Sequence, residues 1–217
     1  IKAVTALNAY AATAITALTA QNTQGVFGIH AVPIAFIRQQ MELVLDDIGA
    51  DAIKTGMLHS AEVIEIVADT IRRKAPGVPL VVDPVMVAKG GASLLDPSAT
   101  GALRQHLLPL AALITPNAPE AAELLGAPVD SLAALERAAQ ALAGLGPQAV
   151  LVKGGHVAGD VVRDVLWANG KLEAFDSPRI PSTSTHGTGC TLASAIAAGL
   201  AQGLPMRAAV IRARAYD

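Results

Sequence analysis

Short apolar runs alternate with longer segments of helical spacing along most of this sequence, and that alternation limits the fold more than any other feature. Continuous aliphatic runs are typical of strands buried on both faces of a sheet. Apolar residues three and four positions apart mark one face of a helix. The predicted strands of this kind are 52–58, 80–84, 113–117 and 149–153. The predicted helices are 33–48, 60–74, 96–107, 131–145 and 192–203, with one that holds Glu120 and Glu123 and another that starts near Pro205. Strands that alternate with helices form mostly parallel sheets, so we expect an α/β fold with a mostly parallel central sheet.

Four further strands are expected. The later part of 11–20 is predicted as a strand that carries Gln21 at its carboxyl end, and 26–32 as a short strand after a turn at Gln24-Gly25. Asn169-Gly170 separates the strands 161–167 and 171–175 and is a strong hairpin signal, since both residues accept the positive φ of a tight turn.

Polar residues directly follow several of the predicted strands. Ligands of parallel α/β sheets bind outside the carboxyl ends of the strands, so these side chains are expected at one edge of the sheet. They are Gln21, Asp83, Asn117 and Lys153, together with the backbone beside Met57 and the turn at 187–190. Their convergence predicts a single ligand site built by segments that lie far apart in the sequence.

The turn at 187–190 carries the most specific chemistry. Gly187 and Gly189 flank Thr188 at the start of a helix, and glycines let the backbone turn sharply and approach a ligand. The first amides of that helix lack intrahelical partners and lie at the positive end of its dipole, which favours an anion. Cys190 falls in the first turn, where the same field favours a thiolate. An anion site beside a potential base suits phosphoryl transfer.

Composition excludes several classes of protein and site. The 217 residues suffice for one domain with a sizeable core. Lys and Arg number 16 against 18 Asp and Glu, and no basic patch stands out, so nucleic acid is not expected as a partner. One cysteine excludes an internal disulfide and a multi-cysteine metal site. The sequence has no uninterrupted apolar run of about 18 residues and no visible secretory signal, so we expect no membrane partner and a cytoplasmic location.

Six short motifs occur in an order that resembles the hydroxymethylpyrimidine/phosphomethylpyrimidine kinases of thiamine biosynthesis, in the ribokinase-like superfamily. They are Gln21-Asn22-Thr23, Lys54-Thr55-Gly56-Met57-Leu58, Asp83-Pro84-Val85-Met86, Thr115-Pro116-Asn117 with Glu120, Val152-Lys153-Gly154-Gly155-His156 and Thr185-His186-Gly187-Thr188-Gly189-Cys190-Thr191. The resemblance covers nearly the whole chain. It implies a ribokinase-like three-layer α/β/α sandwich formed by residues 1–217 as a single kinase domain. The family's first strand with its Gly-rich loop is expected before Ile1, and a further stretch after Asp217.

The resemblance also implies an activity. The enzyme would use ATP and Mg²⁺ to phosphorylate 4-amino-5-hydroxymethyl-2-methylpyrimidine, and then its monophosphate to the diphosphate. A homodimer is implied by the family as well. Gln21 would hydrogen-bond the aminopyrimidine, because a side-chain amide offers both a donor and an acceptor. Met57 and Val85 would line the pocket for the ring. Asp83 and Glu120 would help to place Mg²⁺, directly or through water, as hard oxygen ligands do.

The remaining implied roles concern the nucleotide and the transferred group. Asn117 and Lys153 would lie toward the nucleotide phosphates. Thr185 would join Gly187, Thr188 and Gly189 in an anion hole for the transferred phosphoryl group. Cys190 would take the proton from the substrate hydroxymethyl group. Many ribokinase-like enzymes have Asp at this position, and Cys is similar to the pyrimidine kinase branch or a related pyridoxal kinase branch.

Other interpretations of these residues stay open. Cys190 could be a small core residue, Asp83 an ordinary strand-ending residue, and Glu120 a first-turn carboxylate that complements the helix dipole. Met57 could be a core residue, and Lys89-Gly90-Gly91 could be a hinged lid or a plain loop. The alternative functions are a pyridoxal kinase, which acts on a similar flat heterocycle with a hydroxymethyl group, and a non-catalytic vitamer-binding protein.

Overall fold

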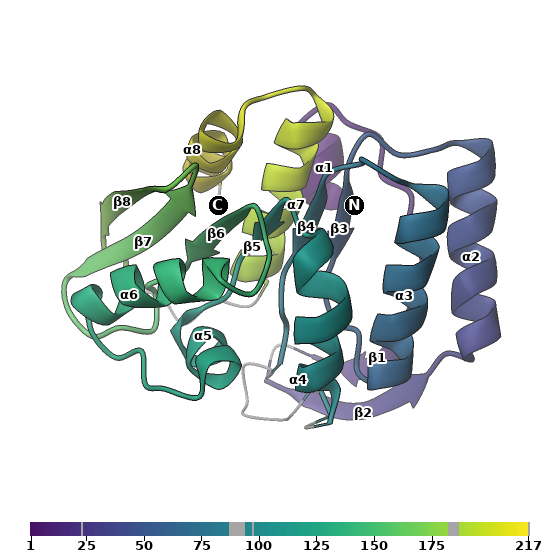
Figure 1. Cartoon of the computed structure of the whole chain (residues 1–217), viewed down its shortest axis with the longest axis horizontal. Coiled ribbons are helices and arrows are strands. Elements are labelled where there is room, and N and C mark those ends of the chain that lie inside the picture. Colours follow the sequence, from purple (N-terminus) through teal and green to yellow (C-terminus); the bar gives the residue numbers. More distant parts are fainter. Residues whose placement is uncertain (23, 87–93, 97, 182–186, 217) are drawn as a thin grey trace.

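The computed structural model describes residues 1–217 except 23, 87–93, 97, 182–186 and 217. Its centre is a six-stranded sheet in which the strands follow one another in chain order (Figure 1). The first four strands pair in parallel, and the last two form an antiparallel extension. The strands are β3 (Ile53–Thr55), β4 (Leu80–Val82), β5 (Leu113–Ile114), β6 (Ala149–Val152), β7 (Val161–Ala168) and β8 (Lys171–Pro178). The prediction of a mostly parallel sheet is confirmed.

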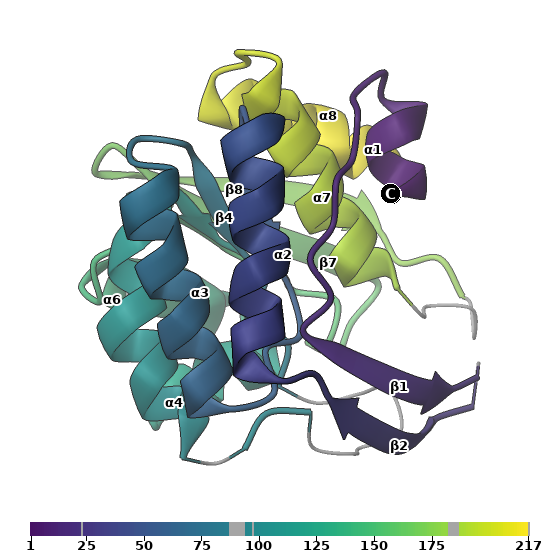
Figure 2. The ribbon, with the colours of Figure 1, turned by 90° about the vertical axis from the view of Figure 1, so that its right-hand side faces the viewer.

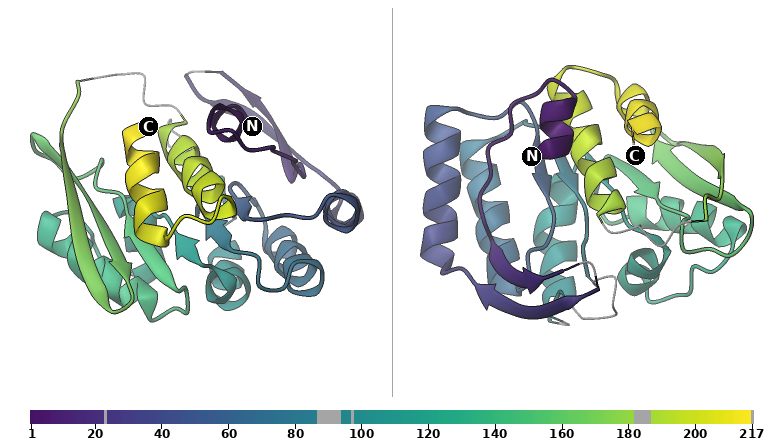
Figure 3. Two further views of the ribbon diagram at one scale, coloured as in Figure 1. Left: turned by 90° about the horizontal axis from the view of Figure 1, so that it is seen from above. Right: turned by 180° about the vertical axis from the view of Figure 1, so that it is seen from behind.

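Helices cover both faces of this sheet, as the view from above in Figure 3 shows. Alternate residues of the strands face opposite sides, so Val82 and Ile114 join one apolar cluster while Val81 and Leu113 join another. The first cluster is completed by α2 (Ile34–Asp47), α3 (Ala61–Lys74), α4 (Ala99–Ala102), α5 (Ala118–Leu125) and α6 (Leu132–Ala143). The second is completed by α7 (Thr188–Ala201) and α8 (Met206–Tyr216), with the short α1 (Lys2–Ala6) beside α7. The result is the predicted three-layer arrangement.

Local sequence signals account for several element boundaries. The Ser60 hydroxyl accepts a hydrogen bond from the Val63 N–H at 3.3 Å and caps α3. Asn169 and Gly170 have φ of 52° and 73°, which matches the two-residue hairpin turn predicted between β7 and β8. The predicted strand 52–58 is shorter than expected, because regular pairing ends at Thr55.

The N-terminal hairpin differs from the expectation in one important respect. β1 (Ala17–Gln21) and β2 (Val26–Ala31) pair only with each other, as a separate two-stranded antiparallel sheet. Figure 2 shows this hairpin beyond the end of α2 at which the chain enters that helix. The expectation that Gln21 lies at the carboxyl edge of the central sheet was therefore wrong. Within the part of the chain that the structure describes, no helix has the length and apolar character needed to span a bilayer.

Candidate active site

A cavity of about 1150 Å³ lies at the carboxyl edge of the central sheet. Its walls come from the segments that follow β4, β5 and β6, from the first turns of α5 and α7, and from the β7–β8 hairpin. Most of the predicted site residues line it, namely Asp83, Val85, Asn117, Glu120, Lys153, Gly187, Thr188, Gly189 and Cys190. The structure thus brings together side chains from four separate segments, as the parallel topology predicts.

Asp83 is the centre of the charge arrangement. It directly follows β4 and is only 2% exposed. Its Oδ1 accepts hydrogen bonds from the Lys153 ammonium at 3.0 Å and from the Thr115 hydroxyl at 3.1 Å. The Lys54 ammonium lies 3.8 Å from Oδ2. A buried carboxylate needs such partners, because an unpaired charge in the interior is costly. Asp83 therefore lies between two lysine ammonium groups and pairs with both. Its role is more than that of an ordinary residue at the end of a strand.

Lys153 connects this carboxylate to the start of α7. Its side chain is 14% exposed. Burial lowers its pKa, but the charges of Asp83 and Glu120 raise it by more, so the pKa lies above its ordinary value. A Cβ atom on Gly189 would lie 3.0 Å from the Lys153 ammonium nitrogen. Glycine at 189 therefore lets a permanently charged ammonium group approach the first turn of the helix.

The first turn of α7 has the features expected of an anion site. Gly187 is the N-cap residue in the left-handed conformation, with φ of 84°, and it offers no side-chain cap. The Thr191 N–H donates to the Gly187 carbonyl at 2.9 Å, which begins the helical ladder. The Gly189 and Cys190 amides precede Thr191 in the first turn of this 14-residue helix, where backbone N–H groups have no intrahelical partner. Together with Lys153, they place positive electrostatic potential at this end of the cavity.

Cys190 is exposed in this turn, but its pKa is not lowered as the sequence predicts. Partial burial raises the pKa of the thiol above its ordinary value, and the neighbouring Asp83 raises it further. The ammonium groups of Lys54 and Lys153 act in the opposite direction without reversing the result. The expectation that the start of the helix favours a thiolate at Cys190 is therefore wrong. The predicted role of Cys190 as the base stays a prediction.

Asn117 and Glu120 cap α5 as a reciprocal pair. The Asn117 Oδ1 accepts from the Glu120 N–H at 2.9 Å, and the Glu120 Oε2 accepts from the Asn117 N–H at 2.8 Å. This capping box explains the local need for both residues. Burial raises the pKa of Glu120 to about 7, although the charge of Lys153 and the bond from Asn117 lower it. Burial disfavours the ionised form of this carboxyl group, so an additional cation nearby would be favourable because it stabilises that form.

The carboxylates that line the cavity could supply part of the ligand set of Mg²⁺. No group of three or more His, Cys, Asp and Glu side chains that could hold a metal is present among the described residues. Asp83 and Glu120 line the same cavity and supply carboxylate oxygens. Mg²⁺ in phosphoryl-transfer sites is commonly held by one or two carboxylates, with phosphate oxygens and water as its other ligands. The two carboxylates fit that pattern and do not form a closed protein cage.

Three predicted site residues are not placed in this cavity. Gln21 ends β1 in the separate hairpin and is exposed. Met57 lines a second cavity of about 790 Å³ that lies beside β3, and its carbonyl accepts a hydrogen bond from the Thr16 hydroxyl at 2.7 Å. Thr185 and the Lys89-Gly90-Gly91 segment lie outside the described residues. The roles predicted for Gln21, Met57 and Thr185 stay predictions.

Several residues that organise the site are not predicted from the sequence. Lys54 and Thr115 belong to two of the six motifs, but their contacts with Asp83 join neighbouring parallel strands and are not visible in the sequence. Arg179 lies outside all six motifs. Its guanidinium donates to the carbonyls of Gly159 at 2.6 Å, Gly155 at 2.9 Å and Val157 at 2.5 Å, and thereby holds the loop after Lys153.

Comparison with known proteins gives a consistent result. The sequence profile of a family described as phosphomethylpyrimidine kinase matches residues 1–216. The thiamine biosynthesis bifunctional protein ThiED of Geobacter sulfurreducens is 52% identical over the whole chain, which spans 44% of that longer protein. The hydroxymethylpyrimidine/phosphomethylpyrimidine kinase of Streptomyces coelicolor is 46% identical, over 100% of this chain and 79% of its own. An ADP complex of Bacillus subtilis pyridoxal kinase superposes with a TM-score of 0.91 at 35% identity, covering 99% of this chain and 82% of that one.

Proposed function

The chain belongs to the phosphomethylpyrimidine kinase family, and we propose that it transfers the γ-phosphoryl group of ATP to 4-amino-5-hydroxymethyl-2-methylpyrimidine. In a second reaction it phosphorylates the resulting monophosphate to the diphosphate. Membership of the family confirms the resemblance described from the sequence, the kinase class and the ribokinase-like fold. The observation that carries the proposal is the placement of Asp83, Lys153 and the first turn of α7 around one cavity.

This arrangement supports phosphoryl transfer by positioning and charge stabilisation. The amides at 187–189 and the Lys153 ammonium bind the oxygens of the transferred phosphoryl group, where negative charge develops. Asp83 holds Lys153 in place. Cys190, in the same turn, accepts the proton of the substrate hydroxyl. Thr185 completes the anion hole, and Asn117 lies toward the nucleotide phosphates.

Mg²⁺, held by Asp83 and Glu120 directly or through water, would neutralise part of the phosphate charge. Glu120 contributes a buried carboxyl group whose raised pKa, about 7, falls when a cation is near. On the acceptor side, Val85 lines the pyrimidine pocket. Gln21 and Met57 would complete that pocket, which for Gln21 requires the β1–β2 hairpin to approach the cavity in the substrate complex.

Pyridoxal kinase is the alternative function, and the likeness to the Bacillus subtilis pyridoxal kinase favours it specifically. Both substrates are flat six-membered nitrogen heterocycles with a hydroxymethyl group. An ADP-release assay on the full-length protein decides between them, with hydroxymethylpyrimidine, its monophosphate and pyridoxal as separate acceptors. We expect the highest kcat/KM for the two pyrimidines. A preference for pyridoxal would replace the proposed function, and nucleotide binding without turnover on any acceptor would identify a vitamer-binding protein.

We also propose that the enzyme is a homodimer in the cytoplasm, where its phosphoryl donor ATP is available. Large apolar side chains are exposed on the β1–β2 hairpin and on the outer face of α2, and a second copy of the chain would cover them. They include Leu18, Phe27, Phe36 and Leu43. Light scattering on the purified protein should give the mass of two chains. Phe27→Ser, at a residue that is 72% exposed, should shift the mass toward one chain, and an unchanged dimer would place the interface elsewhere.

We also propose that residues 1–217 form one kinase domain. Strands β3 to β8 form one continuous sheet, and the helices on its two faces complete two apolar clusters. Urea unfolding followed by circular dichroism and by fluorescence should then show one coincident transition, and two separate transitions would contradict the proposal.

A further inference from the structure

The turn after β6 carries Lys153 into the cavity, and its backbone is held unusually close to β7. A Cβ atom on Gly154 would lie 1.9 Å from the Arg163 carbonyl oxygen, so only glycine fits at this point. The Gly154 N–H donates a hydrogen bond to the Asp164 Oδ1 at 3.0 Å. A side chain of the neighbouring strand is thus bonded directly to the backbone of the turn.

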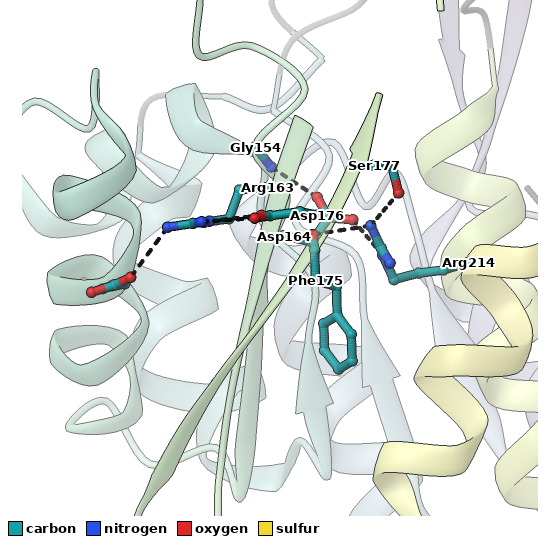
Figure 4. A network of polar contacts seen from close by, with 8 residues as sticks. Gly154, Arg163, Asp164, Phe175, Asp176, Ser177 and Arg214 are labelled. Atoms are coloured by element: carbon teal, nitrogen blue, oxygen red, sulfur yellow. Dashed lines mark hydrogen bonds and ion pairs between the residues drawn. The ribbon is translucent and has the colours of Figure 1, made fainter. Parts of the chain in front are cut away.

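Asp164 is in turn held by the last helix. It is 8% exposed, and its Oδ2 accepts from the Arg214 Nε at 2.9 Å. The Arg214 Nη2 also donates to the Phe175 carbonyl at 3.1 Å and to the Ser177 hydroxyl at 3.0 Å, and the guanidinium lies 5.2 Å from the centre of the Phe175 ring. Figure 4 shows this chain of contacts from α8 through Asp164 to Gly154. Asp164 and Arg214 both line the cavity at the carboxyl edge of the sheet.

A second ion pair on the same hairpin offers a natural comparison. Arg163 is next to Asp164 and so faces the opposite side of β7, where it binds Asp176 through two hydrogen bonds of 2.7 Å (Figure 4). The side chains of this pair are 27% and 48% exposed, and neither residue lines the cavity. Both are Asp–Arg pairs with one member on β7, but only the Asp164 side chain hydrogen-bonds the turn that carries Lys153.

We propose that Asp164 is a positioning residue for phosphoryl transfer, which fixes the Lys153–Gly154 backbone so that the ammonium group meets the phosphates. Arg214 orients the Asp164 carboxylate from α8. Buried ion pairs add little net stability compared with apolar packing, so stability alone is a weak reason for this one. Precise placement is a better reason, since a shift of about 1 Å at a catalytic group can cost about 100-fold in rate. The inference rests on the proposed function.

Asp164→Asn tests the proposal, because Asn keeps the size of the side chain and an acceptor for the Gly154 N–H. When its oxygen keeps the Gly154 bond, its NH₂ group takes the place of Oδ2 and cannot accept from the Arg214 Nε. We expect kcat/KM for ATP to fall by about 10- to 100-fold. The KM for the pyrimidine should stay within about twofold, because Asp164 contacts the turn on the phosphate side. Arg214→Lys should retain more activity than Arg214→Gln, since it keeps a positive charge near Asp164.

Asp176→Asn and Arg163→Gln are the matched controls, and both should keep the wild-type kcat/KM. The proposal is overturned if Asp164→Asn also keeps the wild-type value. It is equally overturned if the loss of activity only follows a loss of folded protein, measured by circular dichroism, with the kinetics of the folded fraction unchanged. Calorimetry with ADP separates this inference from the proposed function. If the wild type phosphorylates no pyrimidine, the proposed function fails. Even then, a weaker ADP affinity in Asp164→Asn than in Asp176→Asn supports the positioning role of Asp164. Equal ADP affinities in the two variants reject that role.

Discussion

Replacing Glu120 by Gln should remove a pH-dependent loss of folding stability. Burial raises the pKa of Glu120 in the folded protein from 4.5 to about 7. Between these two pH values the unfolded chain releases the proton while the folded protein keeps it. The folded state then binds more protons than the unfolded state, so its stability falls as the pH rises through this window. The gap of roughly 2.5 pKa units corresponds to about 3 kcal/mol, at 1.36 kcal/mol for each unit.

Gln is a suitable replacement because it isolates the charge from the other roles of the side chain. Its amide oxygen can still accept the Asn117 N–H, and Gln is a normal partner in a capping box. Burial lowers the pKa of His156, so that residue gives the opposite trend, with stability rising toward pH 6.5. This contribution is common to both proteins and cancels when the free energy of unfolding of the wild type is subtracted from that of the variant.

The measurement is urea unfolding of the wild type and Glu120→Gln at several pH values from 4.5 to 8, with EDTA present to exclude metals. The variant should gain about 3 kcal/mol relative to the wild type between the two ends of this range. Glu123→Gln is the matched control, because Glu123 lies on the same helix and is exposed. A Glu120→Gln difference that varies with pH no more than the Glu123→Gln difference would refute the reasoning that burial holds the Glu120 carboxyl group protonated.

Three further changes test other parts of the site. Cys190→Ala should lower kcat by about 10²- to 10⁴-fold with little change in the KM for ATP, and steady-state kinetics at the wild-type rate would reduce Cys190 to a packing residue. Gly154→Ala should lower the free energy of unfolding by at least about 1–3 kcal/mol, because the added Cβ meets the Arg163 carbonyl. Gly155→Ala is the control, since the space around that position is open, and equal urea midpoints for the two variants would contradict the geometry. Lys54→Met should raise the pKa of Cys190 further, so alkylation by iodoacetamide at pH 8, followed by mass spectrometry, should slow; an unchanged rate would remove Lys54 from the electrostatics of the thiol.

Much of the central sheet could be predicted because its signals are local. The strands β4, β5 and β6 are continuous aliphatic runs, and each is followed directly by polar residues that the parallel arrangement places at one edge. The hairpin of β1 and β2 was also recognisable as two strands. The separation of this hairpin from the central sheet was not predictable, because the backbone N–H and C=O groups of its strands could equally pair with the edge of that sheet. The placement of Gln21 was wrong for this reason.

The site was predictable in position but not in its internal contacts. The Asn-x-x-Glu spacing of Asn117 and Glu120 is a readable capping signal, and it accounts for both residues without a ligand. The contacts of Lys54 with Asp83 and of Arg214 with Asp164 join segments that only the folded topology brings together. The sequence places Cys190 in the first turn of a helix, but it does not reveal the buried carboxylate beside the thiol.

The raised pKa of Cys190 is compatible with a role as the base, because the proton is transferred late in the reaction. Burial and the charge of Asp83 raise the pKa of the thiol, while Lys54 and Lys153 lower it without reversing the result. Phosphoryl transfer has a loose transition state, so the acceptor hydroxyl needs its proton removed only late, and positioning supplies most of the rate. A base used late need not be ionised in the resting protein, but it must lose its own proton before it can accept that of the hydroxyl. A cation held beside Asp83 would offset the interaction that raises the thiol pKa, and it would therefore favour that loss of the Cys190 proton.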